Sequence, residues 1–295
     1  MNSAEMTAKI AAGQGFIAAL DQSGGSTPKA LNGYGIDDDA WADEAGMYGL
    51  IHDMRCRIIR SSAFHGDKVI GAILFERTMD GQIDGAPVPA ALIAKGVVPF
   101  IKIDKGLEDE IDGVQMMKPM PDLDVLLTKA KALGVYGTKE RSVINAANSD
   151  GIAAIAAQQF AVGQQVLAHG MMPIIEPEVN IKSASRALCD TMLREALLKQ
   201  LDAMPAGQQV MLKLSLPVVP GHFDSLVSHP GVLRVVALSG GFNRPEACTE
   251  LAKNPGVIAS FSRALLEDLR APMTDAEFGA ALGAAIDDIH AASVA

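Results

Sequence analysis

Residues 209–217, QVMLKLSLP, have the apolar density of a strand buried on both faces, as in the interior of a parallel sheet. Lys213 stands in the middle of this run. Burial disfavours a charged amine, so we expect Lys213 to have a lowered pKa and to form Schiff bases with carbonyl compounds. The competing interpretation is that Lys213 lies at a strand end and reaches water or a carboxylate.

Seven further stretches have the short apolar runs of buried strands, and helical patterns separate them. They are GFIAALD (15–21), VIGAILF (69–75), VVPFIKI (97–103), YGTKERSVI (136–144), MMPIIE (171–176), RVVAL (234–238) and GVIASF (256–261). Eight such strands without a break in composition predict an α/β fold, a (β/α)8 TIM barrel, with residues 1–295 as one domain. An open doubly wound sheet is the alternative, although no GxGxxG motif follows the first strand.

Apolar residues at helical spacing predict the helices between these strands. One helix is expected around residues 47–58, and another from Leu123 to its stop at Gly134. Ser149 is expected to cap an Ala-rich helix that runs toward Gly170. Two more are expected near 184–204 and 278–289, whereas QSGGSTP (22–28) is typical of a turn.

The bulk composition excludes several classes of protein. A formal charge of −10 argues against nucleic-acid or anionic-membrane binding, so an anionic ligand would need a local basic pocket. Three cysteines, far apart in sequence, suggest no disulfide framework and a reduced, cytoplasmic compartment. We expect neither a secretion signal nor a membrane span, because no basic segment precedes an apolar core and no long apolar run occurs. The six histidines show no metal-ligand spacing, so no metal is expected.

Charged residues gather at the carboxyl ends of the predicted strands, where barrel enzymes place their functional groups. They are Asp21, Lys102, Lys139, Arg141, Glu176, Glu178, Lys213 and Arg263, joined by Ser239. Charges seldom occupy buried apolar strands, so this pattern predicts one shared cavity. There Lys139 would lower the pKa of Lys213 further, and Glu176 and Asp21 would act as counter-charges and acid–base groups. An internal salt-bridge network is the structural alternative.

Two segments near the end of the chain suit a phosphate group. ALSGG (237–241) offers Ser239, Gly240 and Gly241, and SFSR (260–263) offers Ser260 and Arg263. Glycine N–H groups approach an anion closely, serine adds a hydroxyl donor, and arginine adds a planar fork. QSGGS (22–26), with Ser23, Ser26 and the more distant Lys102, is a second candidate anion site, for which an ordinary flexible turn is the alternative.

These segments resemble the class I, Schiff-base-forming fructose-bisphosphate aldolases, in particular their shorter bacterial members. The similarity runs in order through ALDQSGGS (19–26), ILFERTMDG (73–81), VVPFIKIDKG (97–106), GTKERSVI (137–144), PIIEPEV (173–179), VMLKLSL (210–216), ALSGGF (237–242) and SFSRAL (260–265). It implies a lyase of the cytoplasm that needs no cofactor and cleaves fructose 1,6-bisphosphate in glycolysis and gluconeogenesis. A homo-oligomer is a further implication. The alternatives are a Schiff-base aldolase for another sugar phosphate, such as tagatose 1,6-bisphosphate, and a non-catalytic barrel scaffold.

Position by position, the resemblance implies that Lys213 forms the imine with the C2 ketone and that Glu176 shuttles protons. Asp21 and Lys139 would orient and stabilise the carbinolamine. The implied ligands of the C1 phosphate are Ser239, Gly240 and Arg263, and those of the C6 phosphate are Lys102, Arg141 and the loop Ser23–Ser26.

The sequence also departs from the better-known vertebrate pattern. Gln22 replaces an acidic residue, Ala30 an arginine, Ser262 a glycine and Glu140 a tryptophan. The chain ends in SVA, without the family's C-terminal tyrosine. These departures bear on the contacts of the C6 phosphate and on the group that protonates the enamine.

Overall fold

A single sheet forms the centre of the computed structural model, which describes residues 1–295. Eight parallel strands follow one another in the order β1 (Phe16–Leu20), β2 (Val69–Leu74), β5 (Val98–Lys102), β7 (Gly137–Ile144), β8 (Met172–Val179), β9 (Val210–Ser215), β10 (Val232–Leu238) and β11 (Val257–Ala259). The backbone N–H of Ala19 donates to the carbonyl of Phe261 at 3.1 Å, which brings the last strand round to the first. The result is the predicted (β/α)8 barrel, nearly closed, and the eight strands lie within or overlap the eight predicted runs.

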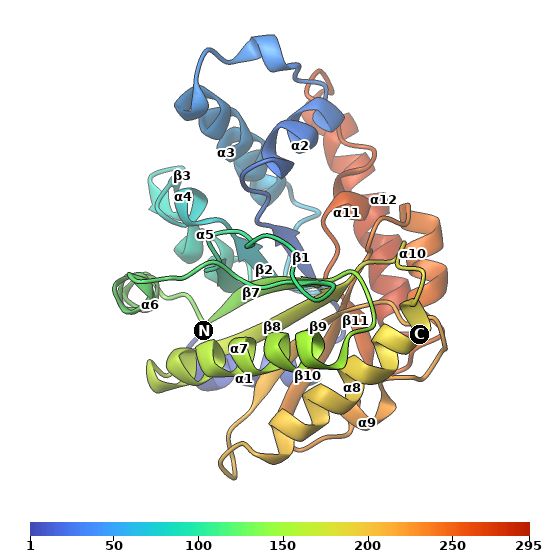
Figure 1. The fold of residues 1–295 in the computed structure, drawn as a ribbon. Coiled ribbons are helices and arrows are strands. Elements are labelled where there is room, and N and C mark those ends of the chain that lie inside the picture. The colour runs from blue at the N-terminus through green and yellow to red at the C-terminus, as the bar shows by residue number, and fades with distance from the viewer.

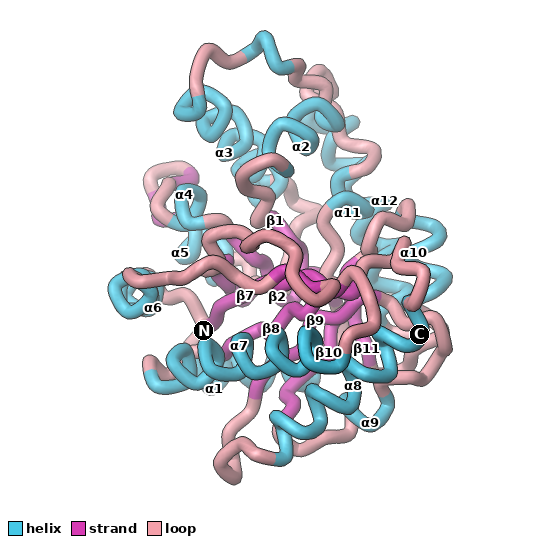
Figure 2. The backbone as a smooth tube through the Cα atoms, viewed as in Figure 1, coloured by secondary structure: helices cyan, strands magenta, loops and turns pink.

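Helices surround these strands (Figures 1 and 2). They are α1 (Ser3–Ala12), α2 (Ser26–Tyr34), α3 (Glu44–Arg60), α4 (Glu76–Met79), α5 (Val88–Ala94), α6 (Leu123–Ala132), α7 (Ser149–Ala168), α8 (Arg186–Asp202), α9 (Asp224–Val227), α10 (Arg244–Leu251), α11 (Arg263–Leu266) and α12 (Asp275–Ser293). The helices α2 and α3 stand together on one side of the sheet (Figure 1). None of the helices has the length and apolar character needed to cross a membrane.

Some local structure differs from the sequence-based expectations. Asn148, and not Ser149, caps α7, because its side chain accepts a hydrogen bond from the N–H of Gly151. The turn-like segment QSGGSTP ends inside α2, which begins at Ser26. The helix α1 was not predicted, nor were the hairpin β3 (Gln82–Ile83) with β4 (Ala86–Pro87) and the short strand β6 (Val114–Gln115), which pairs with β7.

The apolar core has two parts, outside and inside the barrel. A cluster of 63 buried residues fills the space between the sheet and the helices. A second cluster of 13 fills the barrel itself, and Met6 and Ile10 of α1 close its lower end. Phe100 belongs to this inner cluster, and residue 137 next to it must be glycine, because a Cβ there would clash with the carbonyl oxygen of Met172 and lie 2.8 Å from the Phe100 ring.

On the inward face, several strands change from apolar to charged as they approach their carboxyl ends. Side chains two residues apart on a strand share a face. The changes run from Phe100 to Lys102, from Ile174 to Glu176 and from Met211 to Lys213. The charged residues therefore rest on a layer of packed apolar side chains.

Candidate active site

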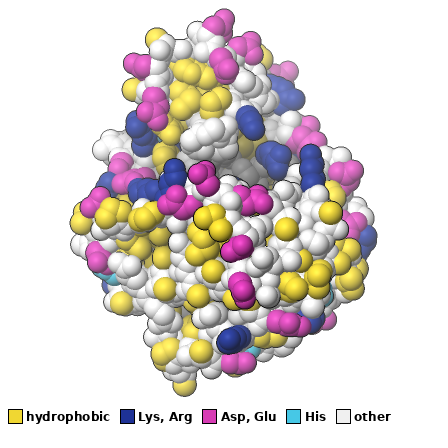
Figure 3. Space-filling view, viewed as in Figure 1, with side chains coloured by type: hydrophobic (Ala, Val, Ile, Leu, Met, Phe, Trp, Pro, Cys, Tyr) yellow, Lys and Arg dark blue, Asp and Glu magenta, His cyan; other side chains and the backbone are white.

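A cavity of about 790 Å³ opens at the carboxyl ends of the strands. Figure 3 shows this face of the molecule hollowed, with lysine, arginine and acidic side chains around the hollow. All fourteen residues that the sequence singled out line the cavity: Asp21, Ser23, Ser26, Lys102, Lys139, Arg141, Glu176, Glu178, Lys213, Ser239, Gly240, Gly241, Ser260 and Arg263. The fold thus brings together groups that are spread over more than two hundred residues of sequence.

Four ion-paired residues form the floor of this cavity: Asp21, Lys139, Glu176 and Lys213. Lys139 Nζ lies 2.8 Å from Asp21 Oδ2 and 2.7 Å from Glu176 Oε2. The other oxygen of Glu176, Oε1, lies 3.1 Å from Lys213 Nζ. All four residues are at most 8% exposed. One carboxylate therefore joins the two buried amines.

The pairing decides the protonation of the floor. Burial alone would raise the pKa of Asp21 and of Glu176, but the charges of Lys139 and Lys213 outweigh burial and lower both. Burial would lower the pKa of Lys139, but Asp21 and Glu176 outweigh it and raise that pKa. At neutral pH both carboxylates are ionised, so Glu176 is able to accept a proton. Lys213 lies within hydrogen-bond reach of it.

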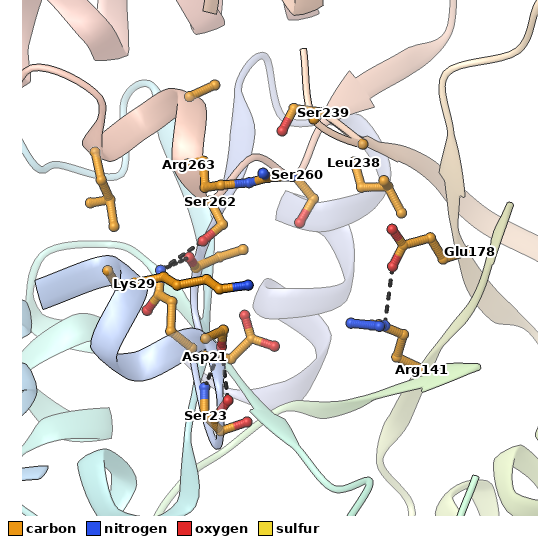
Figure 4. Close-up of a pocket in the computed structure, with 18 of the residues that line it drawn as sticks. Asp21, Ser23, Lys29, Arg141, Glu178, Leu238, Ser239, Ser260, Ser262 and Arg263 are labelled. Atoms are coloured by element: carbon orange, nitrogen blue, oxygen red, sulfur yellow. Dashed lines mark hydrogen bonds and ion pairs between the residues drawn. The ribbon is translucent and has the colours of Figure 1, made fainter. Parts of the chain in front are cut away.

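One part of the mouth, which we call the open rim, carries donors without carboxylate partners. It consists of Ser239, Gly240, Gly241, Ser260 and Arg263. The backbone φ angles of Gly240 and Gly241 are +63° and +125°, values that residues with a side chain rarely adopt. The hydroxyl of Ser260 is buried without a hydrogen-bond partner, and Arg263 extends into the cavity with no ion pair (Figure 4). This is the arrangement expected of a site for an anion.

Another part of the mouth, the paired rim, holds cations that carboxylates already neutralise. Lys102 Nζ lies 2.6 Å from Asp104 Oδ1, and Arg141 Nε lies 3.1 Å from Glu178 Oε2 (Figure 4). Burial lowers the pKa of Lys102, an effect that Asp104 partly opposes. An anion that binds here must compete with these carboxylates.

The loop after β1 is held by a small hydrogen-bonded turn. Ser26 Oγ accepts from the N–H of Ser23 at 2.9 Å and donates to the carbonyl of Ser23 at 2.8 Å. The turn leads directly into α2, so both serines lie at the start of a helix that borders the cavity.

Sequence reasoning missed Lys29, which lies on α2 and points into the cavity (Figure 4). Its side chain has no ion pair in the structure. The available signal was its spacing from Ser26, because residues three apart share a helix face. The prediction that residues 22–28 form only a turn hid this relation.

Glu140 faces away from the cavity. It lies on β7 between Lys139 and Arg141, is completely buried, and neither of its carboxylate oxygens has a hydrogen-bond partner. Burial and the nearby charge of Asp104 raise its pKa well above the usual range. The raised pKa favours the protonated form of Glu140, and its side chain takes no part in the floor.

Comparison with known proteins gives consistent results. A family model described as fructose-bisphosphate aldolase class-I matches residues 3–216. The chain is 53% identical over 281 residues to fructose-bisphosphate aldolase class 1 of Porphyromonas gingivalis, covering 95% of each chain. It is 51% identical over 291 residues to the protein of the same name from Synechocystis sp., covering 98% of this chain and 97% of the relative.

Among solved structures, the chain is similar to fructose-bisphosphate aldolase from Plasmodium falciparum, crystallised with TRAP and a small molecule inhibitor. The TM-score is 0.79 at 18% identity, with 99% of this chain and 94% of the other covered. At this identity the likeness concerns the fold, and it agrees with the barrel described above.

Proposed function

The chain belongs to the class I fructose-bisphosphate aldolase family, and from this membership we propose that it cleaves fructose 1,6-bisphosphate through a Schiff base on Lys213. The reversible reaction gives dihydroxyacetone phosphate and glyceraldehyde 3-phosphate. The observation that carries the proposal is the floor, where Lys213 Nζ lies 3.1 Å from the ionised carboxylate of Glu176. A nucleophilic amine and its base are thus already in contact.

In the first step, Lys213 attacks the C2 carbonyl of the substrate. The amine must lose a proton to do so, and Glu176 is the carboxylate within reach. The cationic Lys139, held by Asp21 and Glu176, stabilises the oxygen of the carbinolamine. Glu176 then returns its proton to the carbinolamine hydroxyl, which leaves as water, so a protonated imine remains on Lys213 and Glu176 is again an ionised base.

In the second step, the iminium accepts the electrons of the C3–C4 bond. Glu176 removes the proton of the C4 hydroxyl, glyceraldehyde 3-phosphate departs, and an enamine remains on Lys213. We propose that Glu176, which now carries that proton, returns it to C3. Hydrolysis of the resulting imine releases dihydroxyacetone phosphate and regenerates the amine.

The two phosphates meet different parts of the mouth. We assign the C1 phosphate to the open rim, where its donors are unpaired. We assign the C6 phosphate to Ser23, Ser26, Lys102 and Arg141, of which the two cations must exchange a carboxylate for the phosphate. Lys29 adds a cation without an ion pair to the same cavity.

Borohydride reduction in the presence of dihydroxyacetone phosphate tests the proposal. The wild-type protein should give a stable adduct whose mass maps to Lys213, and Lys213→Ala should give none while keeping its melting temperature within a few degrees. Its turnover should fall by roughly 10⁶-fold, as when other covalent nucleophiles are removed. Lys199→Ala, at an exposed position on α8, is the matched control and should retain both adduct and activity. An adduct that persists in Lys213→Ala contradicts the assignment, and comparison of kcat/KM for fructose and tagatose bisphosphates tests the sugar.

We propose further that the enzyme works in the cytoplasm, in glycolysis and gluconeogenesis, and that it associates with copies of itself. Membership of a family model named Glycolytic supports the first of these statements. Light scattering after gel filtration measures the second.

A further inference from the structure

The barrel is joined most thinly where β11 meets β1. β7 and β8 pair along eight residues of each strand, whereas one backbone hydrogen bond, from Ala19 to Phe261, crosses this seam. Asp21 of the floor follows one side of the seam, and Arg263 of the open rim follows the other. The position of Arg263 relative to the floor therefore depends on whatever else crosses the seam.

A side-chain hydrogen bond crosses the seam just above that backbone contact. Gln22 Nε2 donates to Ser262 Oγ at 2.6 Å and also to the carbonyl of Ala19 at 3.3 Å. Ser262 immediately precedes Arg263, and its carbonyl accepts from the N–H of Leu265 in the first turn of α11. Gln22 thus connects the loop after β1 to the residue from which Arg263 projects.

Arg55 of α3 donates hydrogen bonds to both the backbone and the side chain of Gln22. Its Nη2 donates to the carbonyl of Gln22 at 2.5 Å and to Gln22 Oε1 at 3.1 Å, and its Nη1 donates to Thr78 Oγ1 at 2.7 Å. Arg55 is 0% exposed, has no carboxylate partner and does not line the cavity. Burial lowers its pKa to about 10, which the charge of Asp21 partly opposes, so it remains cationic at neutral pH.

The charge of Arg55 fixes the orientation of the Gln22 amide. A guanidinium only donates hydrogen bonds, so Gln22 must turn its oxygen toward Arg55 and its NH2 group toward Ser262. Burying an arginine without a carboxylate is costly. Here Nη2 meets the backbone and side chain of Gln22 and Nη1 meets Thr78, whereas Nε has no hydrogen-bond partner.

We propose that Arg55, Gln22 and Ser262 form a hydrogen-bonded clasp across the seam, and that this clasp positions Arg263 to bind the C1 phosphate of the substrate. The proposal rests on the proposed function, because it takes Arg263 as a ligand of the C1 phosphate; Arg55 itself is assigned no contact with substrate. Arg55 and Gln22 act as positioning residues. A loosened clasp weakens phosphate binding while the floor keeps its chemistry.

The test measures inorganic phosphate binding by calorimetry, together with KM and kcat for fructose 1,6-bisphosphate. Arg55→Met and Gln22→Leu should each raise the phosphate Kd and the KM about 10-fold, in line with a displacement of 1 Å or less, and change kcat less than about 3-fold. Because Arg55 acts through Gln22, the double variant should raise the Kd no further than either single variant. Additive losses, or an unchanged Kd, would overturn the proposal.

Two controls separate positioning from general stability. Arg57→Met removes another arginine of α3, one that bonds to Tyr34 Oη at 2.9 Å and to the carbonyls of Ala271 and Met273 but not to Gln22 or Ser262, and should lower the melting temperature without changing the phosphate Kd. Trapping of Lys213 by unphosphorylated dihydroxyacetone and borohydride should be as fast in Gln22→Leu as in wild type. Where Arg55→Met does not fold, Gln22→Leu carries the same test. A wild-type protein without an adduct defeats the proposed function, whereas normal trapping with an unchanged Kd in Gln22→Leu defeats only the clasp.

Discussion

The floor and the mouth of the cavity balance their charges in different ways. On the floor, two lysines and two carboxylates satisfy one another at 2.7 to 3.1 Å; three of them lie on strands, and Asp21 directly follows β1. At the mouth, Lys102 and Arg141 have carboxylate partners, whereas Lys29 and Arg263 have none and project from short helices. The floor is thus assembled before substrate arrives, and part of the mouth is left for an anion to complete.

This difference assigns chemistry and binding to separate groups. Floor residues are fixed by their neighbours, so their replacement should act on kcat. Residues of the open rim gain their partner only from the ligand, so their replacement should act on KM. Residues of the paired rim exchange one partner for another and should matter less.

Among variants that keep Lys213, the largest effect is expected on the floor from Glu176→Gln. The amide keeps the volume of the side chain but cannot accept the C4 hydroxyl proton, so kcat should fall by about 10²–10⁴-fold. KM should change little, because no phosphate contact is lost. Steady-state kinetics and single-turnover cleavage measure both quantities. A normal kcat with a raised KM in this variant would contradict the assignment of catalysis to the floor and of phosphate binding to the mouth.

A smaller effect is expected at the two rims. Arg263→Ala removes an unpaired donor and should raise KM by about 10- to 100-fold, the size of a lost charge-assisted hydrogen bond. Arg141→Ala should raise KM less than about 5-fold, because the proposed interaction of Arg141 with phosphate would replace its ion pair with Glu178. Inhibition by inorganic phosphate checks the same order without turnover. Equal effects of the two variants would show that the ion pair at the paired rim does not weaken phosphate binding.

Ion pairs with lysine, rather than the degree of burial, should keep the floor carboxylates ionised. Glu140 is as buried as Glu176 but has no lysine partner, and its pKa is raised where that of Glu176 is lowered. The folded state holds the Glu140 proton at pH values where the unfolded chain has lost it, so Glu140 destabilises the fold increasingly as pH rises above its ordinary value of 4.5. Asp21 and Glu176 act in the opposite direction, because their stabilisation is complete above their ordinary pKa and is lost as pH falls.

Glu140→Gln should accordingly raise the melting temperature by a few degrees at pH 8 and less at pH 5. Scanning calorimetry at several pH values measures the difference. Glu195→Gln, at an exposed position on α8, is the control and should leave the melting temperature unchanged. A gain that is independent of pH would mean that the proton on Glu140 is not the cause.

The smallest effect is expected from chelation. In the proposed mechanism the protonated imine on Lys213 serves as the electron sink, so prolonged dialysis against EDTA should leave kcat/KM within experimental error of the untreated enzyme. Activity that is lost on dialysis and restored by a divalent cation would contradict the proposed mechanism.

The barrel and the floor could be predicted from sequence for a common physical reason. Each buried strand is a continuous apolar run, so a lysine or glutamate within it stands out, as Lys139, Glu176 and Lys213 do. Parallel strands place their carboxyl ends together, and the alternation of side chains then directs these residues inward.

What the sequence did not reveal depends on contacts between distant residues or on local competition. Gln22 and Ser262 are far apart in sequence, and no sequence pattern predicts their hydrogen bond or the bond from Arg55 to Gln22. Lys29 was hidden because glycine and serine next to it are typical of turns. Asn148 displaced Ser149 as the cap of α7 because either side chain can accept the same N–H, and only the backbone geometry decides between them.

The packed interior beneath the floor also determines how solvent reaches the reaction. Met6 and Ile10 of α1, together with the other apolar side chains of the inner cluster, close the lower end of the barrel. Water and protons therefore enter and leave through the same cavity opening as the sugar. In the proposed mechanism the aldehyde product shields the enamine while it occupies this opening, so the C3 hydrogen should exchange with solvent only after the aldehyde has left.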